Sequence, residues 1–332
     1  MQSLKSRLLY FVVKRQLAKL RALNLPLPEF RKAREAAAEK LFKLPANVKL
    51  EETRSAGCHA EWLRPDNAAT DGVVLYLHGG AYVGGSCITH RALAGRVAAA
   101  AGRASLIIDY RLAPEHPFPA AVDDCLAVYR ALLAGPTGRP RVITGDSAGG
   151  NLALVTLMQA RDAHLSLPAC AVLLSPAIDI SMSGPSIRYN AKADPMFSAA
   201  AGDLLPDIYC PGLERTLPLI SPLHGDWRGL PPLYFLAGST EMLLDDSVRA
   251  HDRAQQAGTS SRIDVWPDMP HVFPLFPLAP EAKQAIRDIV AFIDQHARDV
   301  AALPQAAVPD AGQDPALATG LTAAEPANRG SL

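Results

Sequence analysis

The sequence predicts an α/β protein in which helices cover both faces of a mostly parallel central sheet. Three observations support this class: short apolar runs alternate with helical stretches, most of these runs are continuously apolar, and polar or glycine-rich motifs follow their carboxyl ends. Continuously apolar runs are typical of strands that are buried on both faces. Strands that alternate with helices indicate βαβ units, and therefore a parallel sheet.

The chain begins with a helical region. Residues 1 to about 50 are dominated by Ala, Leu, Lys, Arg and Glu, and the prolines at 26 and 28 divide this region into two predicted helices. The apolar runs that follow predict strands at residues 73–77, 104–109, 141–145, 171–175, 232–238 and 261–266. The stretches between and after them predict helices at residues 91–101, 120–133, 151–164, 243–257 and 280–297.

Two segments depart from this alternation. Residues 180 to about 225 contain six prolines and no run typical of a strand, so we expect an insertion there. Residues 300–332 are rich in Ala and Pro, and we predict a disordered tail because they bury too little apolar surface to offset their ordering entropy. The expected organisation is a helical part at 1–50, a main domain at 51–299 that carries the insertion, and the tail.

Composition excludes several classes of partner. The 332 residues carry 33 Lys and Arg against 33 Asp and Glu, and no basic stripe is present, which argues against a nucleic-acid partner. The five cysteines are scattered singly, without the spacing of metal ligands, so we expect neither a disulfide framework nor a metal site. Such cysteine usage is typical of a reduced compartment, and the expected location is the cytoplasm.

The N-terminal apolar run at residues 8–13 is flanked by Lys5, Arg7, Lys14 and Arg15. It is far shorter than the roughly 20 residues that span a bilayer. No small-residue cleavage site follows it, so it does not resemble a signal peptide. A basic amphipathic helix of this kind suits a peripheral contact with an anionic membrane surface. Our expectation is a cytoplasmic protein without that contact.

The first motif that indicates a catalytic residue is Gly145-Asp146-Ser147-Ala148-Gly149, which matches G-x-S-x-G between a predicted strand and a predicted helix. In that context the motif forms a sharp turn that exposes a strained nucleophilic serine, here Ser147. Glycines on both sides allow the strand and the helix to pass closely. The position at a helix N-terminus favours negative charge, because backbone N–H groups point toward it.

A second motif, His78-Gly79-Gly80-Ala81, follows the first predicted buried strand. Glycines in this loop leave backbone N–H groups free to point at a developing negative charge. Together with the N–H of Ala148, the N–H groups of Gly79 and Gly80 are expected to form an oxyanion hole of three donors.

These motifs belong to three blocks, which read HGGAY at 78–82, DYRLAPEHPFPA at 109–120 and GDSAGGN at 145–151. The sequence thereby resembles the hormone-sensitive-lipase-like esterases, bacterial family IV of the α/β-hydrolase superfamily, from about residue 70 to about 295. The resemblance implies the α/β-hydrolase fold, a helical cap formed by residues 1–50 and 180–225, and no cofactor. The family usually has a third glycine where Ala81 stands. In the middle block, Arg111 and Glu115 are expected to pair with each other in a structural loop.

The remaining members of a catalytic triad should follow the serine in the order acid, then histidine. His271 comes after the last predicted strand and matches the histidine loop of the family. Glu241 lies three residues beyond the strand that ends at Gly238, where the family most often carries Asp. Asp245 is the rival acid, although a role in capping the following helix suits it better.

These residues together predict a carboxylesterase that hydrolyses short- to medium-chain acyl esters through Ser147, His271 and Glu241. A lactonase, a deacetylase or an arylamidase would use the same triad. The shape of the cap would distinguish them, and the cap is the part whose structure the sequence predicts least. A non-catalytic small-molecule receptor on the same fold is the alternative of another class. The expected binding partner is a small ester substrate. The sequence leaves open whether the chain forms a homodimer.

Overall fold

The computed structural model describes residues 3–22, 25–135, 139–197 and 199–299. Within these residues an 8-stranded sheet has the strand order β1-β2-β4-β3-β5-β6-β7-β8. Strands β4, β3, β5, β6, β7 and β8 run parallel to one another, whereas β2 is antiparallel to both β1 and β4. The α/β-hydrolase fold expected from the sequence is therefore confirmed.

The strands are β1 (Val48–Ser55), β2 (Cys58–Pro65), β3 (Ala69–Leu77), β4 (Arg103–Asp109), β5 (Pro140–Asp146), β6 (Cys170–Leu174), β7 (Leu233–Gly238) and β8 (Ser261–Trp266). The α-helices are α1 (Leu4–Ala22), α2 (Leu27–Leu41), α3 (Cys87–Ala101), α4 (Ala120–Ala134), α5 (Ala148–Asp162), α6 (Ser186–Tyr189), α7 (Ala199–Tyr209), α8 (Leu244–Gln256) and α9 (Pro280–Asp299). Two short 3₁₀ helices are η1 (Pro222–His224) and η2 (Phe273–Leu275).

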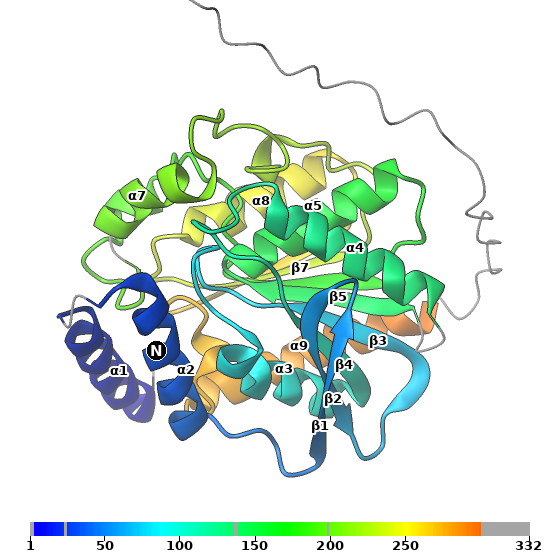
Figure 1. Ribbon diagram of the computed structural model, residues 1–332, viewed down its shortest axis with the longest axis horizontal. Coiled ribbons are helices and arrows are strands. Elements are labelled where there is room, and N and C mark those ends of the chain that lie inside the picture. Colours follow the sequence, from blue (N-terminus) through cyan, green and yellow to red (C-terminus); the bar gives the residue numbers. More distant parts are fainter. Residues whose placement is uncertain (1–2, 23–24, 136–138, 198, 300–332) are drawn as a thin grey trace, which may run out of the picture. The chain divides into compact units, whose positions relative to one another are not determined.

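Successive side chains of the central strands enter two different cores. Leu75 and Leu77 of β3 pack in the core that includes buried residues of α4, α5 and α8. Val74 and Tyr76 pack in the other core, with buried residues of α3 and α9. Figure 1 shows α4, α5 and α8 on one side of the sheet and α3 and α9 on the other. Because both faces are covered, these strands carry apolar residues on both faces, which is why the sequence predicts them well.

The hairpin β1–β2 is absent from the sequence prediction. In β1 only Val48 is buried and the other side chains are exposed or half-buried, and the strand contains no apolar run. A signal is present at the turn, where Ala56 and Gly57 both adopt positive φ (46° and 88°). Two such residues are typical of a tight hairpin whose twist matches that of its strands.

The two helices expected before residue 50 are α1 and α2, and the first strand already begins at Val48. Between residues 180 and 225, the part that the structure describes contains α6, α7 and η1 and no strand, as expected of the insertion. The predicted disordered tail at 300–332 lies outside the described residues. No described helix combines the length and the apolar character that crossing a membrane requires.

Helix α2 is joined to the loop after β4 through one arginine. The Arg31 guanidinium donates to both carboxylate oxygens of Glu115 at 2.8 Å, to the carbonyl of Ala113 at 2.7 Å and to the carbonyl of Val83 at 2.8 Å. The predicted pairing of Glu115 with Arg111 is therefore wrong. Arg111 instead makes a two-pronged ion pair with Asp124 of α4. The physical reason is that the guanidinium that binds Glu115 comes from α2, a distant part of the chain. The sequence of the block at 109–120 does not reveal this partner.

Candidate active site

Ser147 lies at the junction between β5 and α5, with φ 53° and ψ −120°. A non-glycine residue in such a region carries a strain of about 1–3 kcal/mol, which only a well-determined surrounding maintains. Gly145 and Gly149 provide that surrounding, because a Cβ on either would overlap the carbonyl oxygen of Leu77 at the end of β3. The sharp turn predicted from G-x-S-x-G is therefore present, with its serine nearly buried.

His271 approaches Ser147 from the loop after β8. Its Nε2 atom lies 3.0 Å from the Ser147 Oγ, within hydrogen-bonding distance. The loop is fixed at the next residue, where the Val272 N–H donates to the Ser175 Oγ at 3.0 Å and Val272 has φ 48°. Ser175 follows β6, so the ends of two strands together position the imidazole.

Glu241 completes the chain of contacts. Its Oε2 atom lies 2.7 Å from the Nδ1 of His271, and its Oε1 accepts the N–H of Gly238 at 3.0 Å. The carboxylate is fully buried. Since the Nδ1 faces a carboxylate, it carries the proton and leaves the Nε2 free to accept one from Ser147.

Asp245, the rival acid, lies in another environment. Its carboxylate accepts the backbone N–H of Ser186 at 2.6 Å and the Tyr189 hydroxyl at 3.1 Å, both from α6. Within the described residues, the His271 ring bonds to Glu241 and Ser147, and it makes no hydrogen bond or ion pair with Asp245. The structure thus brings together the three residues expected from the sequence and places Asp245 at a contact with the insertion.

Negative charge around His271 favours its protonated form. Burial by itself lowers the pKa of this imidazole, but the hydrogen bond and the charge of Glu241, with further contributions from Asp194 and Asp146, outweigh it and raise the pKa above the ordinary 6.5. Asp146 stays ionised in the interior. Burial raises its pKa, but the charge of His90 and hydrogen bonds from His90 and Tyr76 lower it below the ordinary value.

The loop after β3 brings Gly79 and Gly80 beside the elbow, since Leu77 pairs with Gly145 in the parallel ladder. A Cβ on Gly79 would overlap the side chain of Asp146, and one on Gly80 would overlap the backbone of Gly84. Within the described chain, the N–H groups of Gly79, Gly80 and Ala148 are paired with no protein acceptor. Three unpaired N–H donors close to a strained serine are what an oxyanion hole requires.

His78 supports this loop without taking part in the triad. Burial lowers the pKa of His78, and the neighbouring His90 lowers it further. The resulting pKa is about 4, so the ring is neutral. Its Nδ1 lies 2.8 Å from the Gly79 carbonyl, which accepts, so this nitrogen carries the proton. The ring also stacks on Tyr110 at a centroid distance of 4.3 Å, and the Tyr110 hydroxyl donates to the His78 carbonyl at 2.7 Å.

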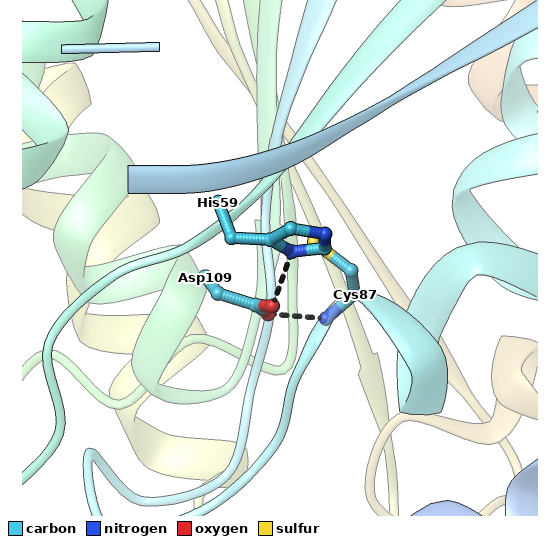
Figure 2. Close-up of side chains that lie close together, drawn as sticks. All are labelled: His59, Cys87 and Asp109. Carbon is cyan, nitrogen blue, oxygen red and sulfur yellow. Dashed lines mark hydrogen bonds and ion pairs between the residues drawn. The ribbon is translucent and has the colours of Figure 1, made fainter. Parts of the chain in front are cut away.

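A second cluster of reactive residue types lies behind the loop. Figure 2 shows His59, Cys87 and Asp109 from three separate elements, with the two dashed contacts meeting at the carboxylate. The Asp109 oxygens lie 2.8 Å from the His59 Nδ1 and 2.6 Å from the Cys87 N–H, which begins α3. These bonds account for the position of Asp109 as a junction between β2, β4 and α3. The expectation that no metal binds stays a prediction.

One cavity of about 580 Å³ lies between α1 and the loops that carry Glu241 and His271. It is lined by Arg7, Tyr10, Phe11, Lys14, Ala193, Pro195, Thr240, Asp268 and Pro270. Ser147 does not line it, so we do not assign this cavity to the reacting group of a substrate.

Two residues of the insertion that sequence reasoning missed contact the Glu241 turn. The Asn190 side-chain amide donates to the carbonyls of Ser239 and Glu241 at 3.0 and 2.9 Å. The Asp194 carboxylate accepts the N–H of Met242 at 2.8 Å. The only signal in the sequence is the Asp194-Pro195 pair, which favours a turn and says nothing of its partner.

The fold and this constellation of residues define the class of protein, and comparison with known proteins agrees. Residues 74–275 match the family described as alpha/beta hydrolase fold, and the chain belongs to that family. An acetyl-hydrolase of Streptomyces hygroscopicus is 43% identical over 240 residues, which cover 71% of this chain and 79% of that protein.

Solved structures agree with this result. A crystal structure of an esterase from the bacterial hormone-sensitive lipase family has a TM-score of 0.83 at 38% identity, covering 90% of this chain and 99% of the other. A crystal structure of EstE5 soaked with p-nitrophenyl butyrate has a TM-score of 0.78 at 41% identity, covering 82% and 92%. The resemblance to hormone-sensitive-lipase-like esterases is confirmed, and the protein is a serine hydrolase of carboxylic esters. The receptor alternative is set aside.

Proposed function

We propose that this carboxylesterase acts on short- to medium-chain acyl esters, with Ser147 as nucleophile, His271 as general base and acid, and Glu241 as the carboxylate that orients His271. The observation that carries the proposal is the continuous hydrogen-bond chain from the Ser147 Oγ through both nitrogens of His271 to the Glu241 carboxylate. Its order along the chain (serine, acid, histidine) is that of α/β-hydrolases.

In the first half-reaction the Ser147 Oγ attacks the ester carbonyl carbon while its proton passes to the Nε2 of His271. The imidazolium that forms is stabilised by the Glu241 carboxylate, which remains ionised. The carbonyl oxygen becomes an oxyanion that the N–H groups of Gly79, Gly80 and Ala148 stabilise. Each such donor is worth about 10²- to 10³-fold in kcat.

The tetrahedral intermediate collapses when His271 returns its proton to the departing alcohol oxygen. The C–O bond of the ester breaks, the alcohol leaves, and an acyl group remains on Ser147. Water then attacks this acyl-enzyme with His271 as base, and the carboxylic acid and free Ser147 are released. The protein needs no cofactor for either step.

The acyl-chain preference is supported by two relatives, an acetyl-hydrolase and an esterase whose crystal was soaked with a butyrate ester. We expect kcat/KM for p-nitrophenyl acetate or butyrate to exceed that for the palmitate by at least about tenfold, since pockets discriminate by about 1–3 kcal/mol per methylene. A series from acetate to palmitate measures this, with the Ser147→Ala variant as background. The proposal would be contradicted if the wild type hydrolysed none of these esters faster than Ser147→Ala does.

The alternatives of the same chemistry belong in the same panel. A lactone, an acetylated sugar and an aryl acetamide of similar size distinguish a lactonase, a deacetylase and an arylamidase from a carboxylesterase of open-chain acyl esters. A kcat/KM for one of these at least about tenfold above the best p-nitrophenyl ester, about 1.4 kcal/mol in transition-state binding, would favour that alternative.

The pH dependence follows from the raised pKa of His271, because only the neutral imidazole accepts the serine proton. We expect kcat/KM to fall as pH is lowered through a single limb whose midpoint lies above 6.5. In Glu241→Gln the carboxylate no longer favours the imidazolium, so the midpoint should move to lower pH. A midpoint unchanged in that variant would contradict the assigned pairing.

The remaining expectations also stand as proposals. Residues 1–50 and 180–225 form the cap, and the protein acts in the cytoplasm without nucleic-acid or metal partners. Helix α1 exposes Leu4, Leu8 and Phe11. Cosedimentation with anionic vesicles would contradict a location free of membrane contact, and light scattering would distinguish a monomer from a homodimer.

A further inference from the structure

We propose that Asp194 is a positioning residue through which the insertion at 180–225 sets the geometry of the Glu241–His271 pair. The proposal rests on the proposed function, since Asp194 would act through the triad. It contacts neither Ser147 nor the carbonyl that Ser147 would attack. Its role would be to hold the turn that carries Glu241 and to add negative charge near His271.

The two oxygens of the Asp194 carboxylate bind different parts of the molecule. Oδ1 accepts the N–H groups of Met196 and Phe197, at 2.7 and 3.1 Å, in the segment that leads to α7. Oδ2 accepts the N–H of Met242, at 2.8 Å, directly after Glu241. One rigid, planar group thus joins the backbone of Met196 and Phe197 to the turn of the triad acid.

Asp194 is buried, so its charge depends on these hydrogen bonds for stabilisation. A carboxylate taken out of water is costly unless hydrogen bonds replace its hydration, and here three backbone N–H groups do so. A group that makes three such bonds and is shielded from water cannot shift without losing some of them. The N–H groups of Met196 and Phe197 and the N–H of Met242 therefore keep a fixed separation.

Asn190 holds the other side of the same turn. Its amide donates to the carbonyls of Ser239 and Glu241, and the Ser186 hydroxyl donates to the Met242 carbonyl at 2.6 Å. The backbone on each side of Glu241 is therefore bonded to the insertion. The Glu241 carboxylate itself has the Gly238 N–H as its other protein partner, so its position depends on where this backbone is held.

The charge of Asp194 also reaches the imidazole. The acidic groups that raise the pKa of His271 are Glu241 on the acid turn, Asp194 on the insertion and Asp146 at the elbow, and burial acts in the opposite direction. On its own loop, Asp268 is the acidic residue nearest in sequence. Among these, Asp194 is the one contributed by the insertion.

The test compares Asp194→Asn with Asn190→Ala and with Asp207→Asn, a matched control on α7 whose side chain is exposed. Asp194→Asn removes the charge and presents an amide near the Met242 N–H. We expect kcat for p-nitrophenyl butyrate to fall about 10- to 100-fold, as misplacement of about 1 Å does, and the acidic limb to move to lower pH. Asn190→Ala should lower kcat without moving the limb, and Asp207→Asn should change neither.

Asp194→Glu keeps the charge and should restore the midpoint of the limb toward that of the wild type, even where kcat stays low. A folded Asp194→Asn protein, judged by circular dichroism, with wild-type kcat and an unmoved limb would overturn the proposal. So would an Asp194→Asn protein with a lower Tm but an unchanged limb, because that is the signature of a merely structural role. Failure of the triad assignment is separate, since it would appear as activity in Ser147→Ala.

Discussion

Replacing Ser147 by alanine is expected to lower kcat for p-nitrophenyl acetate about 10⁶-fold, the size of effect seen when a serine hydrolase loses its nucleophile. Without the hydroxyl no acyl-enzyme forms, and only the oxyanion donors and substrate binding remain to accelerate attack by water. Alanine has a Cβ like serine, so the strained backbone at φ 53° is retained and the fold should be unchanged. Steady-state kinetics with enough protein to measure the residual rate tests this.

The matched control is the double variant Ser147→Ala/His271→Ala. Because the two side chains act as a unit, the second substitution should add almost nothing to the loss caused by the first. Additive losses would contradict the role of His271 as the base for Ser147. Circular dichroism and Tm should match the wild type in the single variant, which excludes unfolding as the cause of inactivity.

Replacing Glu241 by glutamine is expected to lower kcat about 10⁴-fold. The amide has nearly the shape of the carboxylate and retains an oxygen for the Gly238 N–H. It cannot stabilise the imidazolium, and it no longer selects the tautomer of His271 that leaves Nε2 free. Steady-state kcat at a pH above the acidic limb, where His271 is neutral in both proteins, measures the effect.

The comparison for this prediction is Asp245→Asn, which should change kcat by less than about tenfold. That variant weakens contacts of Asp245 with the Ser186 N–H and the Tyr189 hydroxyl, which costs about 0.5–1.5 kcal/mol in the free energy of unfolding. If Asp245→Asn alone abolished activity, the assignment of Glu241 would be wrong.

The parallel part of the fold was predictable because its inner strands are buried on both faces, whereas β8 lies at the edge of the sheet and has no fully buried side chain. Every strand expected from an apolar run is present, and the boundaries of β8 agree at both ends. The β1–β2 hairpin was not predicted, since β1 lies at the edge of the sheet with a mostly polar sequence. For such a strand the Ala56–Gly57 turn carries more information than the strand itself.

The candidate site was predictable where a residue belongs to a local motif. Ser147 and the glycines of the loop after β3 are defined by neighbours in sequence, and His271 by its position after β8. Glu241 and Asp245 are only four residues apart in the sequence. Only the directions of their side chains in the structure show which carboxylate bonds to His271. The contacts of Asn190 and Asp194 join segments about 50 residues apart, so no local pattern contains them.

The central claim is that Ser147 is the nucleophile, and covalent labelling with phenylmethylsulfonyl fluoride followed by mass spectrometry tests it most directly. Trypsin should release residues 142–161, a peptide in which Ser147 is the only serine. We predict one sulfonyl group per chain, located on Ser147, with loss of activity in proportion to labelling and no label on this peptide in Ser147→Ala. Inactivation with the label on another residue, or full activity after Ser147 is labelled, would contradict the account.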